Sequence, residues 1–172
     1  MLRDLFMRLS LEGLYFPRWS SQIHDEWISN VFLNRPDIPA AKLNRTRHLK
    51  DSSSDGSLVD GFEVLIATIS LPDPDYRHVL ALAIYTNSRL IVSFNLRDFP
   101  DYVLREHGKP AVHPDSFLCS IYDSYSVEIL DVVNTMQTEL RKPVFTRTQL
   151  LESFRKQGLN DFANRIEAEL RS

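Results

Sequence analysis

The sequence predicts an α/β domain, with a parallel sheet flanked by helices, followed by an all-helical C-terminal extension. Two observations support this fold class. Short apolar runs at residues 64–69 and 90–94 alternate with segments of helical periodicity, which is typical of a parallel sheet. Beyond Pro114 the pattern becomes purely helical. We therefore place an α/β domain at residues 1–117 and a helical extension at residues 118–172.

The composition is that of an ordinary globular protein and excludes several other classes. The chain has 172 residues, of which 43% are hydrophobic and 25% charged, so it is neither disordered nor fibrous. No apolar run is long enough to cross a bilayer, and the N-terminus resembles an amphipathic helix more than a signal peptide. The single Cys119 excludes an internal disulfide, and we expect a cytoplasmic location. With a net charge of −3, contacts to nucleic acid must come from local basic patches.

Three helices are predicted before the first apolar run. The first occupies the opening twelve residues, and the second begins after Ser20, a good N-cap, and carries Ile23 and Trp27 on one stripe. The third, from about residue 40 to about residue 50, is polar, and the serine-rich residues 51–57 form a loop. Basic residues gather around this third helix: Arg35, Lys42, Arg45, Arg47 and Lys50. They are either a phosphate-binding cluster or a solvated helix face.

The next segments predict the sheet. We expect residues 64–69 to be a buried apolar run, followed by a turn at residues 71–75 in which Asp73 caps the next helix. Residues 89–94 predict a short buried parallel strand, and residues 109–113 a last short strand.

The extension is predicted to contain three helices. The first is one long amphipathic helix that carries apolar and aromatic residues at helical spacing: Tyr122, Tyr125, Ile129, Val133, Met136 and Leu140. Thr146 and Gln149 fit a capping box for the second helix, which Gly158 ends. Asn160 can cap the third, which carries Phe162, Ile166 and Leu170.

Four acidic residues are candidates for chemistry: Glu26, Asp73, Asp75 and Asp98. Ligand sites in open parallel sheets gather at the carboxyl ends of the strands, where three of these four carboxylates would meet. Clustered carboxylates repel one another, so a cation or protons must hold them together, and Mg²⁺ prefers such oxygen ligands. The other interpretation also stays open: Asp73 and Asp75 as capping residues, Glu26 as a solvated flank, and Asp98 as a turn residue.

Several segments resemble known proteins. Residues 71–83 and 90–100 resemble the second half of a PIN domain, in particular the VapC toxin subgroup that carries a helical C-terminal extension. Residues 23–27, Ile-His-Asp-Glu-Trp, are similar to that family's glutamate-bearing helix, and residues 157–162 to its extension. The resemblance implies a PIN-like fold and a metal-dependent endoribonuclease whose Mg²⁺ or Mn²⁺ is held by acidic residues. Glu26 would be the second acidic group and Asp98 the fourth, with Asn95 beside it.

The resemblance also implies substrate and partners. The chain would be the toxin of a VapBC-type toxin–antitoxin pair, acting on RNA, with an antitoxin segment covering the acidic cleft and a homodimer as its assembly. Asn95 and Ser93 at the strand's end, and Arg18 and Arg77 close in sequence to site elements, are the candidate substrate-binding residues. His78, two residues after Tyr76, either borders the cleft or, as we prefer, caps or packs, and we interpret His24 and His113 as structural.

The chain departs from the family pattern in two places. The family's opening strand and its aspartate are missing, since the sequence starts at the helix that follows them; the PIN-like domain is thus predicted to be N-terminally truncated. Tyr76 stands where the family carries its third aspartate, and Asp73 or Asp75 would have to substitute. We therefore predict a ribonuclease of low activity. The alternatives are a non-catalytic PIN remnant acting as a binding or regulatory module, and an incomplete copy of an active enzyme whose start codon lies upstream.

Overall fold

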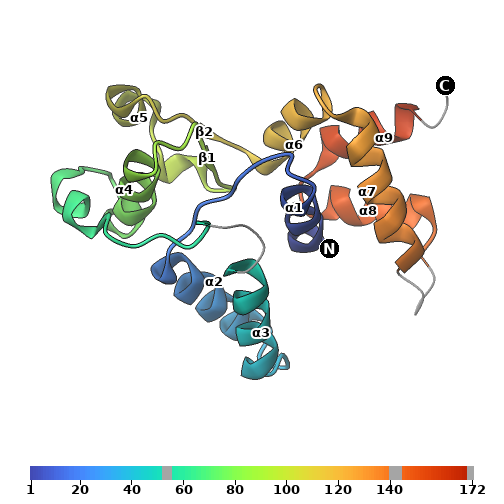
Figure 1. The fold of residues 1–172 in the computed structure, drawn as a ribbon, viewed down its shortest axis with the longest axis horizontal. Coiled ribbons are helices and arrows are strands. Elements are labelled where there is room, and N and C mark those ends of the chain that lie inside the picture. The colour runs from blue at the N-terminus through green and yellow to red at the C-terminus, as the bar shows by residue number, and fades with distance from the viewer. Residues whose placement is uncertain (52–55, 140–144, 170–172) are drawn as a thin grey trace. The chain divides into compact units, whose positions relative to one another are not determined.

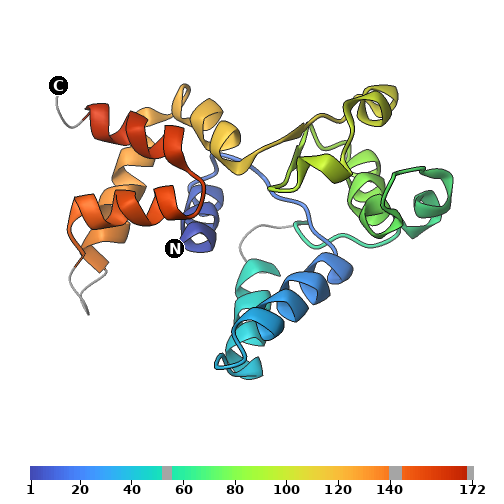
Figure 2. The same cartoon turned by 180° about the vertical axis from the view of Figure 1, so that it is seen from behind.

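The computed structural model describes residues 1–51, 56–139 and 145–169, with the side chains of residues 49 and 50 left out. The chain divides into two compact units. Residues 16–112 form one, here called the sheet unit; residues 1–15 together with residues 113–172 form the other, here called the helical unit. Figures 1 and 2 show a mostly helical chain with a small two-stranded sheet, which is compatible with the predicted α/β class. The domain boundary after residue 117 stays a prediction.

The sheet unit opens with two helices, α2 (Ser21–Asn34) and α3 (Ala40–Asp51). Ser20 caps α2 as predicted, because its hydroxyl accepts a hydrogen bond from the Ile23 amide at 3.3 Å. Trp19, just before α2, forms an isolated parallel bridge with Leu58. The third helix extends to Asp51, one residue into the segment predicted as a serine-rich loop, of which residues 52–55 lie outside the described residues.

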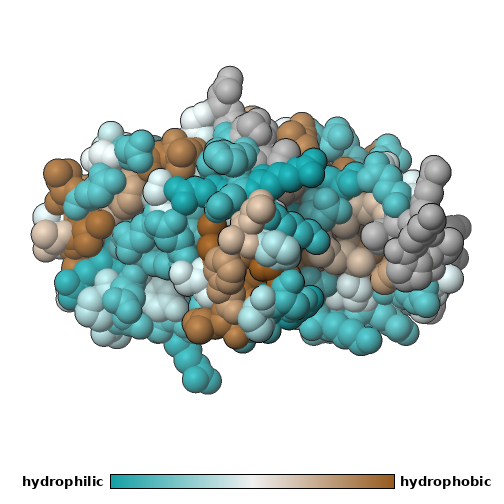
Figure 3. All heavy atoms as spheres, turned by 90° about the horizontal axis from the view of Figure 1, so that it is seen from below, coloured by the Kyte–Doolittle hydropathy of each residue, from teal (hydrophilic) through white to brown (hydrophobic). Residues whose placement is uncertain are grey.

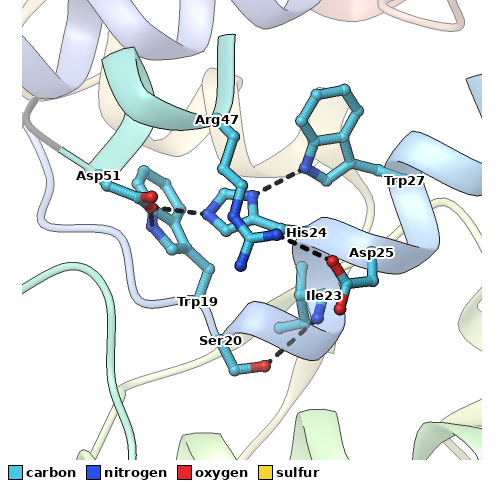
Figure 4. A network of polar contacts seen from close by, with 8 residues as sticks. All are labelled: Trp19, Ser20, Ile23, His24, Asp25, Trp27, Arg47 and Asp51. Atoms are coloured by element: carbon cyan, nitrogen blue, oxygen red, sulfur yellow. Dashed lines mark hydrogen bonds and ion pairs between the residues drawn. The ribbon is translucent and has the colours of Figure 1, made fainter. Parts of the chain in front are cut away.

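A buried histidine ties α2 to α3 (Figure 4). The Trp27 indole N–H donates to His24 Nδ1 at 2.8 Å, so the His24 proton lies on Nε2, which donates to Asp51 at 2.8 Å. The Trp19 indole N–H also donates to Asp51, at 3.1 Å. His24 is fully buried, and the network satisfies both its nitrogens, which agrees with its interpretation as a structural residue.

The rest of the sheet unit consists of short helices and two short strands. They are the 3₁₀ helices η1 (Glu63–Thr68), η2 (Pro74–Tyr76) and η3 (Leu96–Asp98), the α-helices α4 (Arg77–Tyr85) and α5 (Asp101–His107), and the strands β1 (Ile91–Val92) and β2 (Ala111–Val112). The strands pair in parallel, Ile91 opposite Ala111 and Val92 opposite Val112. Both predicted strands are therefore confirmed, although each is shorter than predicted.

The predicted buried run at residues 64–69 is wrong. Residues 63–68 form η1, which contains no buried residue, and the side chain of Val64 is 77% exposed. Only Ile69, after η1, is buried. Apolar composition alone does not distinguish a buried strand from a surface turn of helix.

One apolar cluster holds the sheet unit together. It joins α4 to β1, α5 and the segments that flank η1. Its buried members are Phe62, Ile69, Leu71, Leu80, Ala81, Leu82, Ala83, Ile91, Phe99, Val103 and Leu104. The start of α4 is thereby fixed relative to β1, and three of the four candidate acidic residues, Asp73, Asp75 and Asp98, lie in the segments that adjoin these elements.

The helical unit contains α1 (Leu2–Leu11), α6 (Pro114–Tyr122), α7 (Ser126–Glu139), α8 (Arg147–Lys156) and α9 (Asn160–Glu169). Each contributes fully buried side chains to a shared core: Leu5, Leu9, Leu118, Ile129, Val133, Leu150, Phe154, Leu159, Phe162 and Ile166. The predicted capping box at Thr146 and Gln149 is present in both directions, and Gly158 ends α8 with a φ of +82°.

The single long helix predicted from Tyr122 is wrong. The chain leaves the helix after Tyr122 and begins a second one at Ser126, and Tyr125 in the break is 44% exposed. Asp, Ser, Tyr and Ser at residues 123–126 are all weaker helix formers than Ala or Leu, and three of them bond readily to local backbone. Leu140 and Leu170, predicted on the apolar faces, lie outside the described residues.

Over residues 1–51, 56–139 and 145–169, no helix is both long enough and apolar enough to cross a membrane. Figure 3 shows a face on which hydrophilic residues predominate and apolar residues form separate patches.

Cys119, the free cysteine, is buried as predicted.

Candidate functional site

Glu26 and His78 meet inside the sheet unit. Glu26 lies on α2 and His78 in the first turn of α4, and the Glu26 Oε1 atom is 3.2 Å from His78 Nε2. The other ring nitrogen, Nδ1, lies 2.7 Å from the Asp75 carbonyl oxygen. A carbonyl can only accept, so Nδ1 carries a hydrogen. The ring therefore connects the helix start at Asp75 to the carboxylate of Glu26.

The surroundings of Glu26 favour its protonated form. Partial burial raises the pKa of Glu26, and the negative charge of Asp75 adds to the rise, while His78 and a hydrogen bond from Gln22 oppose it. A carboxyl group with a raised pKa can take up and release a proton nearer to neutral pH. Such groups are frequent in active sites, and they also occur in structural ion pairs.

Asp98 belongs to a second polar group beside the first. Asn95, directly after β1, donates from Nδ2 to the Asp98 carboxylate, and the same nitrogen lies 3.4 Å from the Tyr76 hydroxyl. The Tyr76 ring packs edge-on against the buried Phe99, with ring centroids 5.5 Å apart. Since Tyr76 follows Asp75 in the chain, these contacts bring the groups of Glu26 and Asp98 to one end of α4.

The other predicted site residues have local roles. The Asp73 side chain accepts the Asp75 backbone N–H at 2.9 Å, so it caps η2. The Ser93 hydroxyl accepts the Asn95 backbone N–H at 3.1 Å, and the Ser93 amide extends the sheet by donating to Val112 at 3.0 Å. The Ser93 bond shapes the turn that carries Asn95. The Asp73 bond directs that carboxylate at the backbone of its own 3₁₀ helix.

The two candidate arginines differ. Arg18 donates to the neighbouring Pro17 carbonyl at 3.0 Å and is exposed. Arg77 is half-buried at the start of α4, and its Nε atom is buried with no hydrogen-bond partner within the described part of the chain. Arg77 therefore has an unsatisfied donor close in the chain to Asp75 and His78, whereas Arg18 has no contact that links it to them among the same residues.

The basic cluster around α3 is partly neutralised. Arg35 makes two hydrogen bonds to Asp37, at 2.8 and 2.7 Å, and Arg47 pairs with Asp25 at 2.9 Å. Lys42 and Arg45 are exposed. The side chain of Lys50 lies outside the described residues.

The predicted metal ligands do not come together as one set. In the described ranges, no three His, Cys, Asp or Glu side chains are grouped so that they could hold a metal ion. Asp73 caps η2, Asp98 is bonded to Asn95, and Glu26 faces His78. As placed, these carboxylates do not fit a closed Mg²⁺ or Mn²⁺ site, and the metal stays a prediction.

His78 was considered at the border of the cleft, but a capping or packing role was preferred, and its Nδ1 bond to Asp75 is such a local contact. Its pairing with Glu26 was not predicted. Its contact with Glu26 joins residues far apart in the sequence, which single-sequence periodicity does not reveal.

Comparison with known proteins gives one family match and one curated relative. Residues 114–168 match the family model of the VapC50 C-terminal domain. This segment runs from the start of α6 to the last turn of α9 and makes up most of the helical unit.

The curated relative is the Mycobacterium tuberculosis (strain ATCC 25618 / H37Rv) protein named "Putative ribonuclease VapC50". It is 36% identical to this chain over 97 residues, which make up 56% of this chain and 57% of the relative. The match thus spans little more than half the length of that protein. No solved structure matches the chain. Together, the two similarities support a relationship to the VapC-type family.

Proposed function

We propose that this chain is a VapC-type toxin that cleaves RNA as a weak, Mg²⁺- or Mn²⁺-dependent endoribonuclease of the PIN class. One observation carries the proposal: Glu26 Oε1 on α2 lies 3.2 Å from His78 Nε2 at the start of α4, where the preceding Tyr76 contacts Asn95, which bonds to Asp98. The name of the curated relative supports the same reaction class.

Low activity is part of the proposal. Two candidate carboxylates have hydrogen-bond partners of their own: the Asp75 backbone amide for Asp73 and the Asn95 side chain for Asp98. A divalent ion would have to displace such partners. We therefore expect RNA cleavage to require millimolar metal and to be slow.

The direct test is cleavage of single-stranded RNA with Mg²⁺ or Mn²⁺, with EDTA as the metal-free arm. We expect Glu26→Gln and Asp98→Asn each to reduce the rate by about 100-fold or more, since proton transfer and charge stabilisation contribute on that scale. Asp25→Asn is the matched control, because Asp25 is an exposed carboxylate on the same helix that pairs with Arg47. Cleavage that survives both site substitutions, or that persists in EDTA, would contradict the proposal.

The proposed partners follow from the same family relationship. We propose RNA as the substrate, a small antitoxin whose segment covers the Glu26–Asp98 region, and a homodimer as the assembly. Light scattering of the purified chain tests the dimer. Hydrogen exchange tests the antitoxin contact: addition of the cognate antitoxin should protect the Glu26 region.

A second function is favoured by Tyr76. Its ring occupies the turn beside Asp98 and packs on Phe99, where the resemblance requires a carboxylate. The chain would then be a non-catalytic binding or regulatory module that retains the fold. RNA binding without cleavage, together with no heat of Mn²⁺ binding at millimolar concentration, would favour this function over the first.

A further inference from the structure

His78 is the buried polar residue whose surroundings the proposed function does not yet explain. It is 1% exposed, although it lies in the first turn of α4 between the exposed Asp75 and the apolar core. A histidine is rarely so buried without polar partners, because an unsatisfied buried nitrogen is destabilising.

The hydrogen bond of Nδ1 to the Asp75 carbonyl fixes the orientation of the His78 ring. Nδ1 donates to the Asp75 carbonyl at 2.7 Å, so Nε2 is the nitrogen directed at Glu26, 3.2 Å from Oε1. Nε2 is buried and has no hydrogen-bond partner of good geometry within the described ranges. The Glu26 carboxyl group lies within ion-pair distance of this atom, and the contact is attractive when one proton lies between Nε2 and Oε1, carried by the imidazolium or by the carboxyl group.

Glu26 needs such a contact to stay at the site. Its side chain is 42% exposed, and its hydrogen-bond partner Gln22 belongs to the same helix. Asp75 repels it, and a free glutamate has rotamer freedom that a fixed position must overcome. His78 is anchored in α4, so its contact with Glu26 crosses from one element to another.

We propose that His78 is a positioning residue for Glu26: it holds the Glu26 carboxylate next to Asp75 so that this carboxylate can act in RNA cleavage. The inference rests on the proposed ribonuclease function for the reaction, and on the contacts of His78 for the positioning.

Two substitutions separate the two nitrogens of His78. Gln at residue 78 can place an amide near the position of Nε2 and keep a polar contact to Glu26. Asn can reach only the position of Nδ1, so it keeps the Asp75 bond and loses Glu26. We expect His78→Asn to lower kcat for single-stranded RNA about 10- to 100-fold with KM changed little, as for a misplaced reacting group. His78→Gln should retain most of kcat.

A double-variant cycle tests whether His78 acts through Glu26. Combining His78→Asn with Glu26→Gln should lower kcat no further than Glu26→Gln alone. The matched control is His24→Gln, a substitution of an equally buried histidine on α2 that bonds to Trp27 and Asp51. Its effect should add to that of Glu26→Gln. Equal losses for the Asn and Gln variants, or additive losses for His78 and Glu26, would overturn the inference.

A spectroscopic readout keeps the test independent of turnover. In the folded chain labelled with ¹⁵N-histidine, Glu26→Gln should move the Nε2 resonance of His78 and leave Nδ1 nearly unchanged. An unchanged Nε2 resonance overturns the assignment of His78 whether or not the chain cleaves RNA. Absence of cleavage by the wild-type chain overturns the proposed function instead, so the two failures are distinguishable.

Discussion

Tyr15 lies in the helical unit with its ring edge-on to Phe6 and Phe117, at centroid distances of 6.1 and 5.3 Å. Its hydroxyl donates to the Phe6 carbonyl at 2.8 Å. Burial raises the pKa of the Tyr15 phenol, since the interior disfavours the phenolate. The hydroxyl thus ties the segment after α1 back to α1, while the ring packs on Phe117 of α6, and the raised pKa makes the unit sensitive to alkaline pH.

Tyr15→Phe tests this contact. The folded chain holds the Tyr15 proton more tightly than the unfolded chain, which releases it above pH about 10, so the free energy of unfolding should fall as pH rises past that value. At pH 7 the variant should be less stable by about 0.5–1.5 kcal/mol through the lost hydrogen bond. Urea unfolding at several pH values should show this deficit shrinking above pH about 10. Parallel pH curves for the two proteins would contradict it, and Tyr125→Phe, at an exposed tyrosine, is the control.

Residue-scale prediction succeeded where the cause was local. Asp73 caps the turn that begins at Pro74, and Ser20 caps α2, because both contacts span two or three residues of chain. The pairing of His78 with Glu26 depends on how α2 and α4 pack, and no spacing in the sequence encodes that distance. The capping role of Asp73 was therefore predictable, whereas the contact of Glu26 with His78 was not.

Asp115 joins two elements of the helical unit. It lies in the first turn of α6, is 8% exposed, and accepts the backbone N–H groups of Asp161 and Phe162 at 3.0 and 2.9 Å. The first turn of α9 is thus capped by a carboxylate from another helix, which suits the positive end of the helix dipole. Asn160 was predicted to supply this cap.

Asp115→Ala should leave both amides without their partner and reduce the free energy of unfolding by about 1–3 kcal/mol. Asp115→Asn keeps an acceptor and should reduce it less. Hydrogen exchange should accelerate first at residues 161 and 162. Asp131→Ala, at an exposed carboxylate of α7, is the control and should change stability by no more than about 0.5 kcal/mol. Equal effects of the two alanine substitutions would argue against the cap.

The capping box of α8 is a second element-scale test. The Thr146 hydroxyl accepts the Gln149 amide at 3.2 Å, and the Gln149 side chain accepts the Thr146 amide at 2.9 Å. Thr146→Ala should lower the free energy of unfolding by about 1 kcal/mol. Thr148→Ala, an exposed threonine two residues away, is the matched control, since alanine there should be neutral or stabilising. Denaturant unfolding of both variants decides the point.

Elements were predictable where residue type and periodicity agreed. The helices α1 and α8 and the two strands have both, and they appear where the sequence placed them. The helix predicted from Tyr122 had apolar periodicity across a run of weak helix formers, and the helix ends at Tyr122, before the break at residues 123–125. Residues 64–69 are almost all apolar, so no alternation of polar and apolar residues indicated which side chains are buried, and Val64 in fact faces solvent.

At the scale of the whole molecule, the chain has two cores. Leu80 is fully buried in the cluster of the sheet unit, and Phe154 is fully buried in the helical unit. Residues 1–15 belong to the second core although the sheet unit follows them directly in sequence. The helical unit therefore joins segments far apart in the sequence, which the order of elements does not reveal.

Two core substitutions test whether the units unfold separately. Leu80→Ala should lower the stability of its unit by about 2–5 kcal/mol, and Phe154→Ala by about 3–5 kcal/mol, through lost burial and the cavity left behind. If each core is its own cooperative unit, hydrogen exchange should accelerate within residues 16–112 for Leu80→Ala. For Phe154→Ala it should accelerate within residues 113–169 and in α1. Faster exchange at α1 together with α8 would link the N-terminal helix energetically to the segment that matches the VapC50 C-terminal domain. Uniform acceleration across both units in either variant would instead mean that the chain unfolds as one.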